Sequence, residues 1–168
     1  IRAEVTFAAT ETRISGQDRY KTAVEVSKKI FPKGTNTIIL ARGDEFADAL
    51  TSTPLAYKVN GPILLTKPND IPDSTLAEIK RLQVKHVILV GGTKAISPGI
   101  EQQLVDKGIQ VERISGSDRV GTSLKIAEYL NPSHNDIYVV NQSKFPDALV
   151  IAPYAAKRHI PIILLRDK

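Results

Sequence analysis

The sequence predicts an α/β fold of Rossmann-like or flavodoxin-like architecture, a parallel sheet with helices on both faces, built from tandem repeats. Short runs of β-branched and aliphatic residues alternate along the chain with segments of helical periodicity. These runs are apolar at every position instead of every second one, as is typical of parallel strands buried on both faces. In addition, several sequence blocks recur at nearly constant spacing, which indicates an internal duplication.

The duplication is carried by three ordered blocks. The recurring pairs are 12–19 with 112–119, 46–50 with 145–149, and 62–65 with 161–164. The offset is 100 residues in the first pair and 99 in the other two, a one-residue deletion that a loop tolerates. We therefore expect a first copy at 12–111 and a second at 112–168. The second copy has no counterpart of 86–111, so it is incomplete at its C-terminal end.

Six strands and six helices follow from the alternation of patterns. Strands are expected at 37–41, 62–66, 86–90, 109–114, 137–140 and 160–165, and helices at 19–30, 44–59, 72–83, 97–107, 119–130 and 143–158. The helix starts carry recognisable signals: Asp18 and Asp44 are expected N-caps, because their carboxylates accept hydrogen bonds from free backbone N–H groups. Pro72 and Pro98 suit the first helical position, where no N–H is needed.

Candidate binding residues lie where strands lead into helices. Ligands of open α/β sheets bind beyond the carboxyl ends of the strands. Glycine lets the backbone approach an anion closely, helix N-termini offer free N–H groups, and arginine is a planar, bidentate donor. The predicted ligand-binding residues are Ser15, Gly16, Asp18, Arg19, Arg42, Ser115, Gly116, Asp118 and Arg119.

A purely structural interpretation of the same residues stays open. In it, Ser15 and Gly16 shape a tight turn, and Asp18 only caps the following helix. Arg19 would then pair with Asp48 on the next helix, and the pair would repeat as Arg119 with Asp147.

The composition argues against most chemistries. The chain has no Cys, and its three His are not at metal-ligand spacing, so neither a metal nor a cysteine nucleophile is expected. It has no G-x-G-x-x-G, no P-loop and no G-x-S-x-G motif. We therefore expect no catalytic residue and no cofactor. The longest apolar runs, such as 160–165, are too short to span a membrane.

The charge and the residue content give two further expectations. The net charge of +5 divides into +3 for residues 1–111 and +2 for residues 112–168, a modest and even excess that does not indicate a nucleic-acid partner. The chain begins with Ile1 and contains no Met, so we expect it to be processed or excised from a longer protein.

Four blocks together resemble the cell-wall-binding repeat of type 2. They are R-I-S-G-x-D-R-x-x-T, F-x-D-A-L, P-I-[LI]-L and V-I-L-V-G-G. This family occurs in surface and secreted proteins of Gram-positive bacteria, including S-layer proteins and autolytic amidases. The resemblance implies Rossmann-like modules, usually three, that anchor a separate functional region non-covalently to an anionic wall polymer.

The sequence thus leads to one expectation and two alternatives. We expect a secreted, non-catalytic anchoring module at the cell wall or cell surface. Its partner would be a teichoic-acid-like polymer or a secondary wall polysaccharide, with further repeats or a homo-oligomer also compatible. One alternative is a structural or assembly module without polymer contact. The other is a small α/β enzyme that acts on a phosphorylated ligand.

Overall fold

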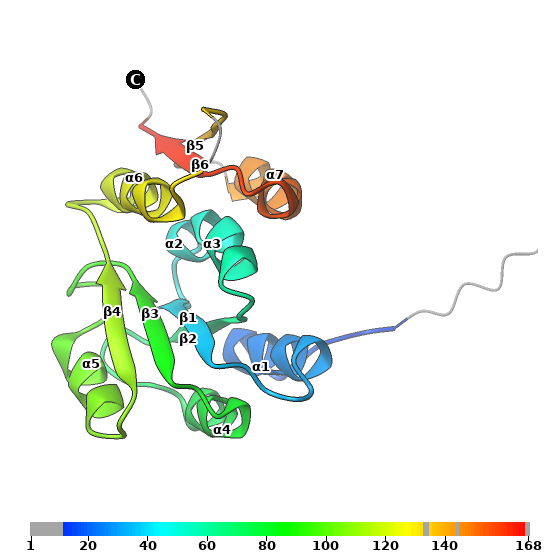
Figure 1. Ribbon diagram of the computed structural model, residues 1–168, viewed down its shortest axis with the longest axis vertical. Coiled ribbons are helices and arrows are strands. Elements are labelled where there is room, and N and C mark those ends of the chain that lie inside the picture. Colours follow the sequence, from blue (N-terminus) through cyan, green and yellow to red (C-terminus); the bar gives the residue numbers. More distant parts are fainter. Residues whose placement is uncertain (1–11, 133–134, 144, 167–168) are drawn as a thin grey trace, which may run out of the picture.

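The computed structural model describes residues 12–132, 135–143 and 145–166, and their strands and helices alternate as expected (Figure 1). Along the chain the elements are α1 (Arg19–Ile30), β1 (Thr37–Arg42), α2 (Ala47–Thr51), α3 (Thr53–Lys58), β2 (Ile63–Thr66), α4 (Asp73–Leu82), β3 (His86–Val90), α5 (Pro98–Val105), β4 (Gln110–Ile114), α6 (Arg119–Leu130), β5 (Tyr138–Asn141), α7 (Phe145–Arg158) and β6 (Ile162–Leu165). The predicted α/β fold is confirmed.

The first sheet is parallel and has the strand order β2-β1-β3-β4. Successive residues of β1 enter different cores, because side chains alternate between the two faces of a strand. Ile38 and Leu40 pack with residues of α4 and α5, whereas Ile39 packs with residues of α3 and α6. Both faces of the sheet are therefore covered, which is why its strands are apolar throughout.

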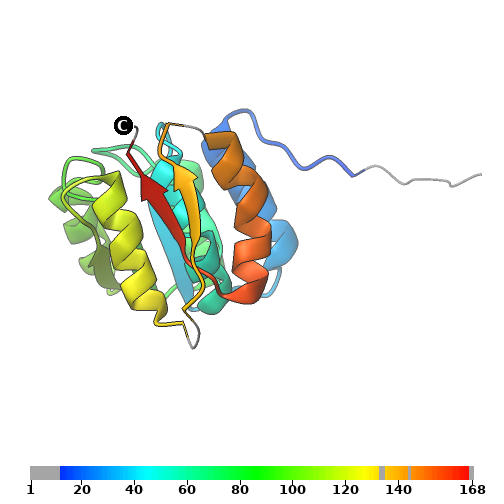
Figure 2. The same ribbon diagram turned by 90° about the horizontal axis from the view of Figure 1, so that it is seen from above.

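The second sheet contains two parallel strands, β5 and β6, paired from Tyr138↔Ile162 to Asn141↔Leu165. Figure 2 shows these strands side by side, with α6 along one side and α7 along the other. In the repeat they correspond to β1 and β2. Their core contains Val140 and Leu164 together with alanines of α2 and α7.

The two copies are joined through α6. Its Ile126 and Leu130 lie in the core of the first sheet. On the same helix the buried Ser123 Oγ accepts a hydrogen bond of 3.0 Å from the Leu164 backbone N–H in β6. In addition, Lys58 Nζ donates to the carbonyl oxygen of Leu130 at 2.5 Å. α6 thus belongs to the second copy by sequence and to both copies by packing.

One expected helix, 44–59, is divided into α2 and α3. Its predicted cap is wrong, because Asp44 pairs with Arg42 and α2 begins only at Ala47. At the division, the Thr51 hydroxyl donates to the backbone carbonyl four residues earlier and the Ser52 hydroxyl to the one three residues earlier, and such bonds bend helices. The equivalent residues of α7 are apolar, and α7 is continuous. The other predicted boundaries differ by no more than two residues.

The packing of α6 predicts the effect of one substitution. Ile126 is fully buried, so Ile126→Ala should lower the free energy of unfolding by about 2–5 kcal/mol through lost contacts and a cavity. Leu124→Ala is the matched control, because Leu124 lies on the same helix and is 47% exposed. Urea unfolding followed by circular dichroism measures both variants. Equal losses would contradict the placement of α6.

Candidate functional site

The repeated Ser-Gly-x-Asp-Arg-x-x-Thr block forms a turn that starts a helix. In the first copy, Asp18 Oδ1 accepts from Lys21 N at 2.7 Å, and Gly16 N donates to Thr22 Oγ1 at 3.0 Å. A Cβ on Gly16 would lie 2.5 Å from the backbone carbon of Lys21, so only glycine fits. Asp18 is therefore the N-cap of α1, as the sequence predicts.

The second copy repeats this turn before α6. Asp118 Oδ1 accepts from Gly121 N at 2.8 Å, and Gly116 N donates to Thr122 Oγ1 at 3.1 Å. The backbone hydrogen bond from Gly121, followed by the side-chain bond from Arg166, lowers the pKa of Asp118. The block thus has a local structural role in both copies.

The purely structural interpretation pairs Arg19 with Asp48 and Arg119 with Asp147, and both pairings are wrong. Arg19 Nη1 donates instead to the Gly43 carbonyl oxygen at 2.7 Å. Arg119 Nη2 lies 3.6 Å from Glu45 Oε2 in the first copy. Because α2 begins late, Glu45 lies in the loop before it and is free to face the second copy.

The loops after β1, β3 and β4 form a cleft of about 440 Å³ at the carboxyl edge of the first sheet. Its lining comes from both copies and consists of Arg42, Glu45, Asp48, Gly92, Thr93, Lys94, Ala95, Gly116, Ser117, Asp118, Arg119 and Thr122. The structure therefore brings together four of the predicted residues, namely Arg42, Gly116, Asp118 and Arg119.

The other predicted residues lie elsewhere. Ser15 and Gly16 line a separate cleft of about 520 Å³ that also includes residues of α1 and α4. Asp18 and Arg19 line neither of the two clefts. Ser115 directly precedes Gly116 but is not part of the lining. The equivalent loops of the two copies thus have different surroundings.

We call the cleft that is lined by both copies the junction cleft. Its two arginines, Arg42 and Arg119, already have carboxylate partners. Arg42 Nη2 donates to Asp44 Oδ2 at 2.6 Å, and Arg42 Nη1 lies 3.6 Å from Glu45 Oε1. The hydrogen bond with Asp44 raises the pKa of Arg42, and the same bond lowers the pKa of Asp44. With Glu45 also beside Arg119, positive and negative groups are close to balanced in the cleft.

Asp48 is a member of the cleft that the sequence analysis did not predict. Its Oδ1 is buried and has no hydrogen-bond partner within the described part of the chain. Burial and the nearby Glu45 raise the pKa of Asp48 to about 6, although Arg119 and Arg42 act in the opposite direction. Its Oδ2 would lie 2.8 Å from a Cβ on Gly91, whose φ is 120°. Gly91 and Gly92, the glycine pair after β3, were therefore the sequence signal from which this close approach of Asp48 could have been inferred.

The junction cleft suits binding of a polar ligand. It offers guanidinium donors, the exposed Lys94 and backbone of glycine-containing loops. Over residues 12–132, 135–143 and 145–166 no three metal-binding side chains gather, and no helix has the length and apolarity needed to cross a membrane. His134 lies outside the described residues.

The family described as Cell wall binding domain 2 (CWB2) matches residues 13–101 and 113–168. The chain belongs to this family and is a cell-wall-binding module built of repeats. The recognition of the family from its sequence blocks is thus confirmed.

Similar proteins include two from Bacillus subtilis (strain 168). The chain is 36% identical over 151 residues to the N-acetylmuramoyl-L-alanine amidase LytC. The matched region covers 90% of this chain and 30% of LytC. It is 39% identical over 161 residues to the amidase enhancer, with 95% and 22% covered. This chain spans less than a third of either relative.

Two solved structures from Clostridium difficile share the fold. Cwp8 has a TM-score of 0.87 at 40% identity, with 92% of this chain and 27% of that chain covered. Cwp6 has a TM-score of 0.83 at 35% identity, with 98% and 28% covered.

The buried carboxyl of Asp48 predicts a pH dependence of stability. Its pKa is about 6 in the folded chain and about 3.9 unfolded, so the folded state binds the proton more tightly. The free energy of unfolding should therefore fall as the pH rises from about 4 to about 6. Asp48→Asn removes this loss and should be more stable than the wild type above pH 6, by up to about 3 kcal/mol.

Urea unfolding between pH 4 and pH 7.5 measures this difference, which should shrink as the pH falls. Asp147→Asn is the control, because the equivalent Asp147 is exposed. An advantage of Asp48→Asn that did not change with pH would contradict the burial of a titrating carboxyl.

Proposed function

We propose that the chain is a non-catalytic anchoring module that binds an anionic wall polymer through the junction cleft. The polymer would be teichoic-acid-like or a secondary wall polysaccharide. One observation carries this proposal: Arg42 of the first copy and Arg119 of the second line the same cleft. Guanidinium groups match the geometry of phosphate and carboxylate, and membership of a cell-wall-binding family supports such a ligand.

The pairing of the arginines sets how binding would occur. Asp44 engages only one edge of the Arg42 guanidinium, through Nε and Nη2. Arg119 faces Glu45 at the longer distance of 3.6 Å, with 42% of its side chain exposed. Both groups thus keep N–H donors for a ligand, while the carboxylates hold them in place. Affinity at one such site would be modest.

Repetition of the loops would raise the total affinity. We include Ser15, Gly16, Asp18 and Arg19 as a second contact for the polymer, equivalent to the Ser115-Gly116 loop. Linked weak sites on one polymer bind with a high effective concentration. The parent protein would be secreted to the wall or cell surface and carry a separate functional region. Support comes from the two B. subtilis relatives, which are longer than this chain.

A further repeat is proposed as a partner of α7. In the first copy, Thr51 and Leu55 are fully buried in a region where α2 and α3 pack against the second copy. The equivalent Val150 and Tyr154 of α7 are 79% and 51% exposed. The repeat places equivalent helices in both copies, α2 and α3 in the first and α7 in the second. Another repeat would therefore cover α7 as the second copy covers α2 and α3.

The polymer proposal predicts the result of wall co-sedimentation. Arg42→Gln/Arg119→Gln should weaken binding to purified walls about tenfold, because charge-assisted hydrogen bonds are lost. Lys67→Gln/Lys125→Gln is the control with the same loss of charge; each of these lysines pairs with a carboxylate on the surface. Walls stripped of anionic polymer should bind neither the wild type nor the two double variants. The proposal is wrong if the wild type does not pellet with intact walls at low salt, or if both double variants weaken equally.

The repeat proposal predicts concentration-dependent association through α7. Val150→Asp should reduce self-association in analytical ultracentrifugation, because a charge on the apolar face opposes its burial. Val105→Asp is the control, since Val105 is also exposed but lies on α5. A wild type that stays monomeric at millimolar concentration would refute this contact.

A further inference from the structure

A cavity of about 700 Å³ opens at the amino-terminal edge of the first sheet, opposite the junction cleft. Asn36, Lys85 and Ile109 each directly precede a strand, β1, β3 and β4 respectively. These starts lie together because parallel strands begin at the same edge. The full lining is Asn36, Leu76, Ala77, Ile79, Lys80, Gln83, Val84, Lys85, Lys107 and Ile109.

The charged side chains of this lysine cavity are all positive. They are Lys80, Lys85 and Lys107, and none of the three has an ion-pair partner within the described part of the chain. The nearby Asp106 accepts a hydrogen bond from Gln102 Nε2 at 2.8 Å and does not line the cavity. The cavity therefore holds uncompensated positive charge, in contrast to the balanced junction cleft.

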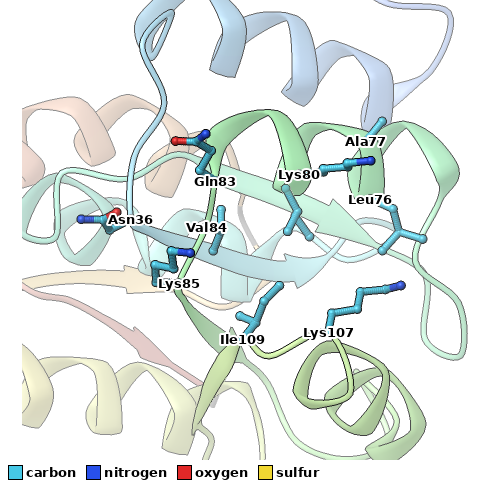
Figure 3. Close-up of a pocket in the computed structure, with 10 residues that line it drawn as sticks. Asn36, Leu76, Ala77, Lys80, Gln83, Val84, Lys85, Lys107 and Ile109 are labelled. Atoms are coloured by element: carbon cyan, nitrogen blue, oxygen red, sulfur yellow. The ribbon is translucent and has the colours of Figure 1, made fainter.

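The walls between the lysines are apolar and well fixed. Figure 3 shows Lys80 and Lys107 at one side of the opening and Lys85 at the other, with Val84 and Ile109 between them. Val84 and Ile109 are buried members of the sheet core, so this floor is rigid. The amides of Asn36 and Gln83 are exposed beside it. Apolar floor, amide groups and a cationic rim match a sugar ring that carries negative charge.

We propose that the lysine cavity binds an anionic saccharide, a segment of polymer whose sugar units carry phosphate or carboxylate groups. The sugar face lies on Val84 and Ile109, and its acidic group is held by the three ammonium groups. This inference rests on the proposed anchoring function and adds a third contact, at the sheet edge opposite Arg42 and Arg119. A polymer chain that reaches both edges is bound with avidity.

The test compares two triple variants with equal loss of charge. Lys80→Gln/Lys85→Gln/Lys107→Gln removes the cationic rim, and Lys67→Gln/Lys125→Gln/Lys157→Gln removes three lysines elsewhere on the surface. Binding is measured to purified walls by co-sedimentation and to polygalacturonate, a carboxylate-bearing saccharide, by isothermal titration calorimetry. Neutral dextran is the uncharged probe. Circular dichroism checks that each variant is folded.

The first triple variant should bind walls and polygalacturonate about tenfold more weakly than the wild type. The control should stay close to the wild type, and dextran should bind to none of them. Equal weakening of both triple variants, or none in the first, overturns the lysine cavity even where walls are bound. If the wild type binds neither walls nor polygalacturonate, the anchoring proposal fails as well. Loss in the lysine variant without loss in Arg42→Gln/Arg119→Gln supports the cavity and removes the junction cleft.

Discussion

The packing of α6 against the first sheet is the interaction on which the rest of the molecule depends. Ile126 and Leu130 share a core with Val90 and Ile114 of the sheet, while Ser123 accepts a hydrogen bond from β6. The loop that carries Gly116 connects β4 directly to this helix, which begins with Arg119. Its position is therefore set from both ends, by a strand of the first sheet and by a helix packed on that sheet. Without this packing the junction cleft would lose one wall.

The two edges of the first sheet differ in their electrostatics. At the carboxyl edge, Arg42 and Arg119 face Asp44 and Glu45, so the ligand binding that we propose there would depend on hydrogen-bond geometry more than on net charge. At the amino edge, three lysines surround an apolar floor without a carboxylate. Longer-range attraction for a polyanion is stronger at this edge, because nothing nearby neutralises the ammonium groups. The modest positive net charge of the chain is thus unevenly distributed over its surface.

The duplication shows how neighbours change the role of similar residues. Asp48 is half-buried in the junction cleft beside Gly91, with its Oδ1 fully buried and its pKa raised, whereas the equivalent Asp147 is exposed. Thr51 is buried where Val150 is exposed. In each pair the two residues occupy equivalent positions of the repeat, but their side chains are covered only in the first copy. The surroundings of a side chain in such a repeat therefore depend on the contact between copies as much as on the repeat itself.

The sequence by itself determined the features that depend on near neighbours. The apolar strands and the cap Asp18 were predicted, because helix caps and hydrophobic patterns involve residues only a few positions apart. The repeat was predicted from sequence blocks that recur along the chain. The division at Ser52 was missed, since it depends on hydroxyl bonds to the backbone that compete with a regular helical pattern. The tertiary structure alone decided which groups meet across long separations. Arg19 reaches Gly43, Arg119 faces Glu45, and the lysine cavity gathers charges from α4, the start of β3 and the turn before β4. Such contacts depend on how helices pack on the sheet, and that packing is set by the whole core and not by local sequence.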